Sequence, residues 1–140
     1  MNSLPKIAYE QPGNGIRPDV TKLDDIRIGI IGLGYVGLPL AVLLARRFPV
    51  TGYDHDAGRI EQLRKGVDRT LEVEPEALAG TRAQFTARAE DLAGCNFYIV
   101  TVPTPIDAAK RPDMRLLIAA CETVGESIGR GDIVVFESTV

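Results

Sequence analysis

The sequence has few of the residues that build disulfide networks and metal centres. Its 140 residues include two cysteines, Cys95 and Cys121, and one histidine, His55. Two thiols and one imidazole supply neither a disulfide framework nor the ligand set of a structural metal. We expect both cysteines to be packed in the core. His55 follows Asp54 at the end of a predicted strand, and we expect it to be a solvated turn residue.

Long apolar runs and clusters of positive charge are also missing. No stretch approaches the roughly 20 apolar residues that a membrane-spanning helix needs, and the polar N-terminus has no signal-peptide core. The net charge is −3, and the 16 Lys and Arg residues are scattered along the chain. These features argue against a membrane protein and against a nucleic-acid-binding surface. They predict a globular cytoplasmic protein.

Three glycines stand between a predicted strand and a predicted helix. The run Ile28–Ile31 is typical of a buried strand, and the run Leu38–Ala45 is apolar and has the length of a helix. Gly32, Gly34 and Gly37 lie between them with the spacing G-x-G-x-x-G. In this setting the motif indicates dinucleotide binding, because the glycines allow a tight turn, a close approach of the pyrophosphate and close helix packing. The free N–H groups at the start of the helix then receive the phosphates.

A carboxylate ends the next predicted strand, Val50–Tyr53. Asp54 lies 54 − 32 = 22 residues after Gly32, close to the ~20 expected for the residue that binds the adenosine ribose. A carboxylate there accepts hydrogen bonds from the ribose hydroxyls and repels a 2′-phosphate, which favours NAD over NADP. The alternative is an ordinary turn in which Asp54 caps the following helix. Motif, element order and spacing agree in favouring the dinucleotide.

The rest of the chain alternates between strands and helices. Residues 1–24 lack periodicity, and we expect an N-terminal extension that is mobile or lies over the surface, followed by one domain over residues 25–140. The expected helices cover about 36–48, 56–66, 74–78, 87–92 and 113–128, the last with an apolar stripe that includes Cys121. The expected strands cover 26–31, 50–53, 84–86, 96–102 and 132–136, the last one buried. The order predicts an α/β fold of the Rossmann type, a doubly wound parallel sheet in three αβα layers, with strand order 3-2-1-4-5.

Two further residues are open to more than one interpretation. Arg59, in the first turn of the second helix, is either a contact to the adenosine or a surface arginine. Thr104 lies in the proline-stiffened loop Val102–Asp107, which leaves the carboxyl end of a central strand, where such sheets bind ligands. The alternative for this loop is a rigid surface turn.

Three separated segments resemble one family. Gly32-Leu33-Gly34-Tyr35-Val36-Gly37-Leu38-Pro39, Val102-Pro103-Thr104-Pro105-Ile106-Asp107 and Glu137-Ser138-Thr139-Val140 are similar, in this order, to the N-terminal domain of the UDP-glucose/GDP-mannose dehydrogenase family. The resemblance covers roughly residues 26–140. Within the family it points to the bacterial UDP-N-acetylhexosamine 6-dehydrogenases of capsule, O-antigen and Vi-polysaccharide synthesis.

The resemblance implies a reaction and a set of site residues. The reaction is oxidation of the C6 alcohol of a UDP-sugar to a carboxylate with two NAD⁺, through a thiohemiacetal and a thioester on a cysteine. The resemblance implies a catalytic role for Thr139, whose hydroxyl orients the water near the nicotinamide, and makes Arg59 an adenosine-side contact. The implied cofactor-binding residues are Gly32, Leu33, Gly34, Tyr35, Val36, Gly37, Asp54, Arg59, Val102, Pro103, Thr104, Pro105, Ser138 and Thr139, and no metal is implied.

The family's catalytic cysteine belongs to a later domain, beyond a long central helix, together with most UDP-sugar contacts. Neither Cys95 nor Cys121 matches its motif. We therefore expect the chain to be the NAD-binding portion of a longer, homodimeric enzyme, and to be inactive alone. Two alternatives remain, a non-enzymatic NAD-sensing module and a fragment of a β-hydroxyacid dehydrogenase. The second shares the glycine motif but not the segments 102–107 and 137–140.

Overall fold

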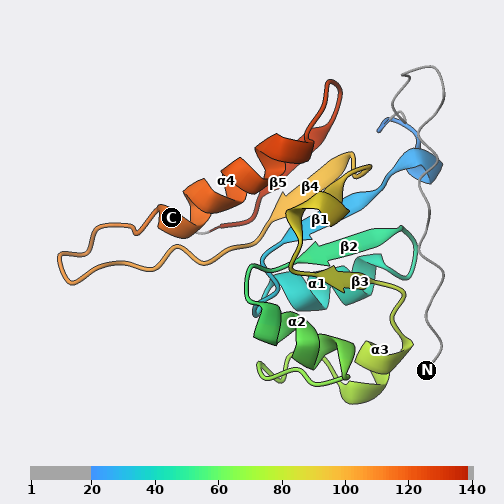
Figure 1. Cartoon of the computed structure of the whole chain (residues 1–140), viewed down its shortest axis with the longest axis horizontal. Helices are drawn as coiled ribbons and strands as arrows, with labels where there is room; N and C mark the ends of the chain where they lie inside the picture. Colours follow the sequence, from blue (N-terminus) through green and yellow to red (C-terminus); the bar gives the residue numbers. More distant parts are fainter. Residues whose placement is uncertain (1–19, 139–140) are drawn as a thin grey trace.

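A parallel sheet forms the centre of the chain. The computed structural model describes residues 20–138, and its strands lie in the order β3-β2-β1-β4-β5, with every neighbouring pair parallel (Figure 1). The strands are β1 (Ile28–Ile31), β2 (Val50–Tyr53), β3 (Gln84–Thr86), β4 (Phe97–Val100) and β5 (Ile133–Phe136). The helices are α1 (Gly37–Leu44), α2 (Ala57–Arg64), α3 (Pro75–Gly80) and α4 (Arg115–Ser127), with 3-10 turns η1 (Leu23–Asp25) and η2 (Ala89–Leu92). The predicted fold class and strand order are confirmed.

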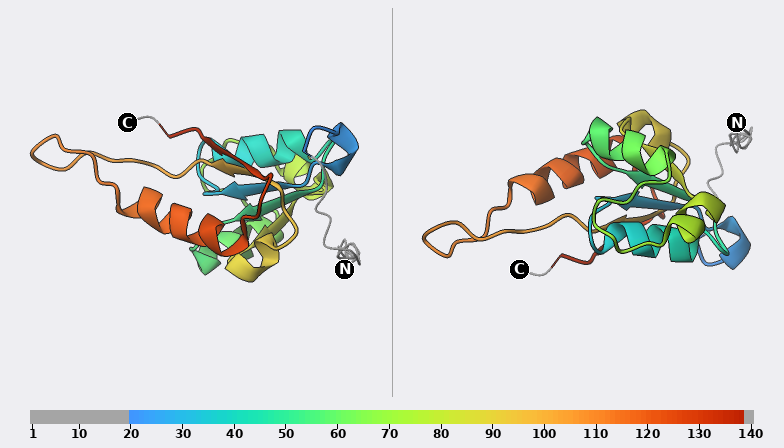
Figure 2. Two further views of the ribbon diagram at one scale, coloured as in Figure 1. Left: turned by 90° about the horizontal axis from the view of Figure 1, so that it is seen from above. Right: turned by 90° about the horizontal axis from the view of Figure 1, so that it is seen from below.

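Helices cover both faces of the sheet, as parallel strands require. On β1, Ile28 and Ile30 belong to the apolar core shared with α1, α2 and α3. Ile31 belongs to a second core, shared with α4 and η2. Figure 2 shows α1 and α4 on opposite sides of the sheet. Because successive side chains of a strand point to opposite faces, this alternation produces the predicted three layers.

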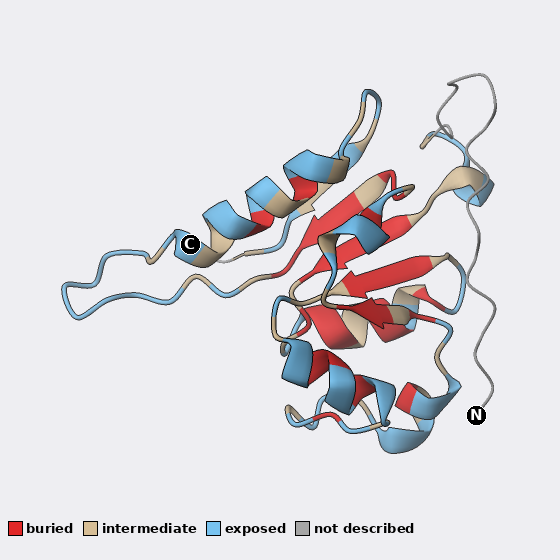
Figure 3. Cartoon of the chain, viewed as in Figure 1, coloured by how far each residue is buried: buried red, intermediate tan, exposed pale blue. Residues whose placement is uncertain are grey.

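α4 and β5 are covered on fewer sides than the sequence predicts. β5 pairs only with β4 among the described strands, and Ile133 and Phe136 are 39% and 53% exposed, so the prediction of a buried strand was wrong. On α4, Ala120 and Val124 are buried, but Cys121 is exposed, and Figure 3 shows the exposed outer side of this helix. Consecutive helical residues are rotated by roughly 100°. Burial of Ala120 therefore turns Cys121 outward, and the prediction of a packed Cys121 was wrong.

The ends of several elements differ from the prediction by one to four residues; α1, for example, ends at Leu44 rather than near residue 48. β1 begins at Ile28, two residues later than predicted, and β4 covers Phe97–Val100, without the first residue and the last two residues of the predicted strand. α2 begins as predicted, with Asp56 at the N-cap accepting the N–H of Arg59. α4 begins later than predicted, because its N-cap is Met114. None of the helices within residues 20–138 is long and apolar enough to cross a membrane.

A buried asparagine fixes the entry of the chain into the sheet. Asn96 is 1% exposed. Its Oδ1 accepts the N–H of Arg27 at 2.8 Å, and its Nδ2 donates to the carbonyl oxygen of Asp25 at 2.8 Å. The segment before β1 is thus attached to the start of β4. The expectation for residues 1–19 lies outside the described residues.

Candidate functional site

The register of the sheet brings the predicted site residues to one edge. Ile31 pairs with Tyr53 and with Val100, and Val100 pairs with Phe136. The residues that follow these strand ends are Gly32, Asp54, Thr101 and Glu137. The winding of the chain reverses between β1 and β4, and open α/β sheets bind ligands at such a switch point, outside the carboxyl ends of the strands.

The glycine turn, residues 32–37, needs two of its glycines for the fold itself. Gly32 has φ of 98°, a conformation that residues with a side chain rarely adopt, and its N–H donates to the carbonyl oxygen of Tyr53 at 2.8 Å. A Cβ at Gly37 would collide with the carbonyl oxygen of Gly32 and lie 2.5 Å from the Oγ1 of Thr101. A Cβ at Gly34 would meet no atom within 4 Å. The middle glycine therefore leaves open space beside the turn.

Unpaired backbone donors surround this space. Within residues 20–138, the N–H groups of Gly34, Tyr35, Val36 and Gly37 donate no hydrogen bond, as is usual in the first turn of a helix. The side chains of Tyr35 and Val36 are exposed. Free N–H groups at the positive end of a helix dipole form a binding site for an anion such as a phosphate.

Asp54 lies directly beside the turn. Its Oδ2 accepts the N–H of Leu33 at 3.0 Å, and its Oδ1 accepts the N–H of Asp56 at 3.0 Å. A carboxylate offers about four lone-pair positions, so these two bonds leave acceptor capacity for a ligand. His55 Nδ1 is 3.6 Å from Oδ1 of Asp54, and the imidazole is 76% exposed. The prediction of a solvated His55 is confirmed.

Arg59 is buried against the turn rather than placed on the surface. It is 1% exposed. Its Nε and Nη2 both donate to the carbonyl oxygen of Leu33, at 3.0 and 2.8 Å, and its Nη1 donates to Oδ1 of Asp68 at 2.9 Å. The interpretation as a surface arginine was therefore wrong. A direct contact between Arg59 and the adenosine stays a prediction.

Sequence reasoning missed Asp68 and Thr101. Oγ1 of Thr101, the residue after β4, donates to the carbonyl oxygen of Gly32 at 2.7 Å, while Arg59 holds the carbonyl oxygen of Leu33. The signal for Thr101 was a hydroxyl residue at the end of the strand predicted to lie beside β1. Asp68 gave no such signal, because its link to the turn passes through a side chain of α2.

The ends of β4 and β5 also meet. Oγ of Ser138 donates to the carbonyl oxygen of Val102 at 2.9 Å. Beyond Val102 the loop is mostly exposed, with Thr104 partly buried and Pro103 and Pro105 exposed, and it extends away from the sheet before α4 begins (Figure 1). Thr139 lies outside the described residues.

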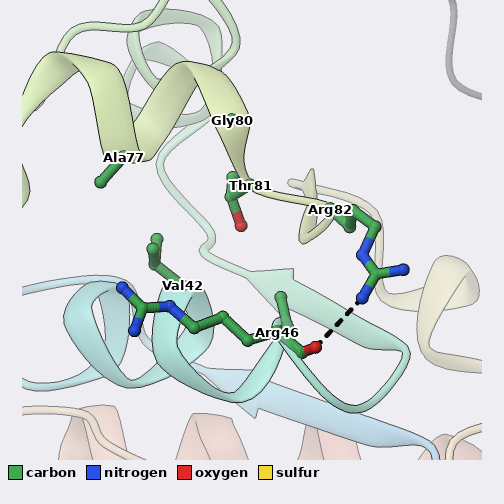
Figure 4. Close-up of a pocket in the computed structure, with 7 residues that line it drawn as sticks. Val42, Arg46, Ala77, Gly80, Thr81 and Arg82 are labelled. Carbon is green, nitrogen blue, oxygen red and sulfur yellow. Dashed lines mark hydrogen bonds between the residues drawn. The ribbon is translucent and has the colours of Figure 1, made fainter.

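A cavity of about 360 Å³ lies elsewhere, between the second half of α1 and the end of α3 (Figure 4). Arg82 donates through Nη2 to the carbonyl oxygen of Arg46 across it at 3.0 Å. Its lining residues are Val42, Ala45, Arg46, Ala77, Gly80, Thr81 and Arg82. None of them is a predicted cofactor residue, so this cavity is separate from the glycine turn.

Comparison with known proteins assigns the chain to a family. Residues 26–140 match the model of the UDP-glucose/GDP-mannose dehydrogenase family, NAD binding domain. The chain belongs to this family. The predicted family and cofactor, NAD, are thereby confirmed.

The relatives are much longer than this chain. It is 53% identical to the UDP-N-acetyl-D-glucosamine 6-dehydrogenase of Salmonella typhi and 48% identical to the protein of that name from Pseudomonas aeruginosa. Each alignment covers 84% of this chain and 28% of the relative. The solved structure of UDP-D-ManNAc dehydrogenase from Pyrococcus horikoshii matches with a TM-score of 0.74 and 37% identity, over 82% of this chain and 29% of that one. The chain thus spans little more than a quarter of these proteins.

The two thiols should differ sharply in reactivity. Burial raises the pKa of Cys95 to about 11, whereas Cys121 is exposed on α4. Because the thiolate is the reactive form, we expect a maleimide at neutral pH to label the native chain once, at Cys121, and to label Cys95 only after denaturation. Mass spectrometry of tryptic peptides measures this, with Cys121→Ser as the unlabelled control. Equal labelling of both cysteines in the native protein would contradict the expectation.

Proposed function

We propose that the chain binds NAD along the carboxyl edge of the sheet, with the pyrophosphate on the glycine turn, residues 32–37. The observation that carries this proposal is the open space at Gly34, bordered by unpaired N–H groups at the start of α1. A dinucleotide pyrophosphate fits such a site in charge and in hydrogen bonding. On the adenosine side, Asp54 accepts hydrogen bonds from the ribose hydroxyls and Arg59 lies next to the turn.

The nicotinamide half of the cofactor lies toward β4 and β5 in this proposal. Val102, Pro103, Thr104 and Pro105 follow β4, and Ser138 and Thr139 follow β5. The hydrogen bond between Ser138 and Val102 supports the assignment, because it joins the two strand ends at the edge that carries the glycine turn. We assign Thr139, the residue after Ser138, to the positioning of water near the nicotinamide.

The reaction proposed for the full-length protein is oxidation of the C6 alcohol of a UDP-N-acetylhexosamine to a carboxylate. Family membership and the two relatives named UDP-N-acetyl-D-glucosamine 6-dehydrogenase support this proposal and favour an enzyme over an NAD-sensing module. The oxidation removes four electrons, so two NAD⁺ each accept a hydride and water supplies the second carboxylate oxygen. The same proposal makes the protein a cytoplasmic homodimer that serves surface-polysaccharide synthesis.

In this division of labour the 140-residue chain holds the cofactor and performs no oxidation alone. Cys95 is buried before β4, at the opposite edge of the sheet from the glycine turn, and Cys121 lies within α4. Isothermal titration of the chain should show NAD⁺ binding more tightly than NADP⁺. Mixtures with UDP-GlcNAc or UDP-GalNAc should produce no NADH absorbance. Absence of NAD⁺ binding would overturn the cofactor assignment, and NADH production would overturn the division of labour.

A further inference from the structure

We propose that Asp68 is a positioning residue of the cofactor site, acting through Arg59 on the carbonyl of Leu33. The inference rests on the proposed binding of NAD to the glycine turn. Asp68 lies in the segment between α2 and α3 and is 7% exposed. No sequence motif indicated a role for Asp68 in cofactor binding.

The first step of the argument concerns the peptide group between Leu33 and Gly34. A peptide group is planar and trans, so its C=O and N–H point in opposite directions. The two donors of Arg59 hold the carbonyl oxygen of Leu33, and they thereby fix the direction of the Gly34 N–H. That N–H is one of the unpaired donors proposed to bind the pyrophosphate.

The preceding peptide group, between Gly32 and Leu33, is held in the same way. Oγ1 of Thr101 donates to the carbonyl oxygen of Gly32, and Oδ2 of Asp54 accepts the N–H of Leu33. The side chain of Leu33 is fully buried, and a Cβ added at Gly52 would lie 2.9 Å from it. Two successive peptide planes of the turn are therefore fixed from the protein side, and Arg59 is responsible for the second.

The second step is the dependence of Arg59 on Asp68. A guanidinium that is 1% exposed needs a counter-charge, because an uncompensated buried charge is strongly unfavourable. An ion pair joins Nη1 of Arg59 to Oδ1 of Asp68 at 2.9 Å, and both side chains are almost fully buried. Without this carboxylate, Arg59 loses both its charge partner and the contact that orients its far nitrogen.

The third step is that Asp68 is itself held firmly. Oδ1 accepts the N–H and the hydroxyl of Thr70 at 2.9 and 2.6 Å, and Oδ2 accepts the N–H groups of Glu72 and Val73 at 2.9 and 3.0 Å. Burial alone raises the pKa of Asp68, but these bonds and Arg59 outweigh it and lower the pKa to about 2. The pKa in the folded chain is thus below the unfolded value of about 3.9. The stabilisation is present above about pH 4 and is lost as the pH falls toward 2.

Arg64 provides a matched control. Its Nε and Nη2 also donate to a single carbonyl oxygen, at 3.1 and 2.7 Å, but that oxygen belongs to Phe85 in β3. Arg64 therefore makes the same forked contact to a part of the sheet that has no proposed role in the cofactor site. Substitution of Arg64 tests the loss of an arginine–carbonyl contact without disturbing the turn.

The experiment compares NAD⁺ affinity by calorimetry with the thermal melting of each variant. Asp68→Asn should weaken NAD⁺ binding roughly 3- to 30-fold, the range for residues that act on a site through a neighbour. Arg64→Lys should change it by less than about twofold. In ¹H–¹⁵N spectra of the ligand-free chain, Asp68→Asn should shift the Gly34 amide resonance, whereas Arg64→Lys should not.

A double-mutant cycle separates a positioning role from general destabilisation. If Asp68 acts through Arg59, Asp68→Asn combined with Arg59→Gln should bind NAD⁺ no more weakly than Arg59→Gln alone. Additive losses, or wild-type affinity in a folded Asp68→Asn variant, would overturn the proposal. If Asp68→Asn does not fold, Asp68→Glu is the second variant, because it keeps the charge and displaces the carboxylate oxygens by about 1.5 Å. Wild-type affinity for NAD⁺ in Asp68→Glu would also overturn the proposal. Failure of the wild-type chain to bind NAD⁺ would overturn the proposed function instead.

Discussion

Gly37→Ala is expected to destabilise the domain and to weaken NAD⁺ binding, whereas Gly34→Ala should weaken NAD⁺ binding without destabilising the domain. A Cβ at Gly37 would collide with the backbone carbonyl of Gly32 and with the Thr101 hydroxyl that bonds it. Backbone cannot yield as a flexible side chain does, so we expect a loss of about 3 kcal/mol in the free energy of unfolding, the upper part of the range for overpacking. That corresponds to a fall in Tm of about 10 °C for a domain of this size.

The same methyl group at Gly34 meets no protein atom within 4 Å, and Gly34 is not among the glycines with positive φ. Alanine at such a position leaves the folded state unstrained and restricts the unfolded chain, so stability should stay equal or rise by about 0.4–1 kcal/mol. The methyl would occupy the space proposed for the pyrophosphate, and the affinity for NAD⁺ should fall at least about tenfold, or 1.4 kcal/mol.

Thermal melting followed by circular dichroism, together with calorimetric titration, distinguishes the two glycines. The decisive pattern is a lower Tm for Gly37→Ala only, with weakened binding in both variants. A Gly34→Ala variant that binds NAD⁺ as tightly as the wild type would place the pyrophosphate somewhere other than the glycine turn.

Asp54→Ala is expected to weaken NAD⁺ binding by about 10- to 100-fold and to remove the preference over NADP⁺. Hydrogen bonds to a charged group contribute about 1.5–3 kcal/mol, and the substitution also removes the acceptor that holds the N–H of Leu33. Asp54→Asn keeps a neutral acceptor at this position. It should therefore lose less affinity for NAD⁺, while losing the repulsion that excludes the 2′-phosphate of NADP⁺.

His55→Ala is the control for the Asp54 variants, because the imidazole is 76% exposed and adjacent in sequence. It should leave both affinities within about twofold of the wild type. Titration of each variant with both cofactors measures the effect. Unchanged NAD⁺ affinity in Asp54→Ala would show that the ribose does not contact this carboxylate.

Local spacing made much of the site predictable from the sequence. The glycine turn and Asp54 are set by residues directly next to predicted strands, and the parallel register places both at one edge without further information. The alternation of strands and helices along the chain predicted the strand order, because connections between parallel strands of one sheet are right-handed.

Features that depend on which surfaces meet were not predictable in this way. The apolar stripe predicted for α4 includes Cys121, yet only the side of α4 that carries Ala120 and Val124 is covered, and Cys121 is exposed. Likewise, the sequence places Arg59 in the first turn of α2, but its burial follows from the approach of that turn to Leu33. The link between Asp68 and the glycine turn depends on the same approach, because it passes through Arg59.

The tethering of both peptide groups around Leu33 has a consequence for the kinetics of association. The Gly34 N–H, one of the donors proposed to bind the diphosphate, is already oriented before a ligand binds, because Arg59 holds the carbonyl oxygen of the same peptide group. The peptide group before it is held by Thr101 and Asp54. The conformational entropy of this bend is therefore lost when the domain folds, and little further loss accompanies complex formation. We therefore expect NAD⁺ to bind in a single kinetic step, with no slower rearrangement of the glycine turn after the first contact.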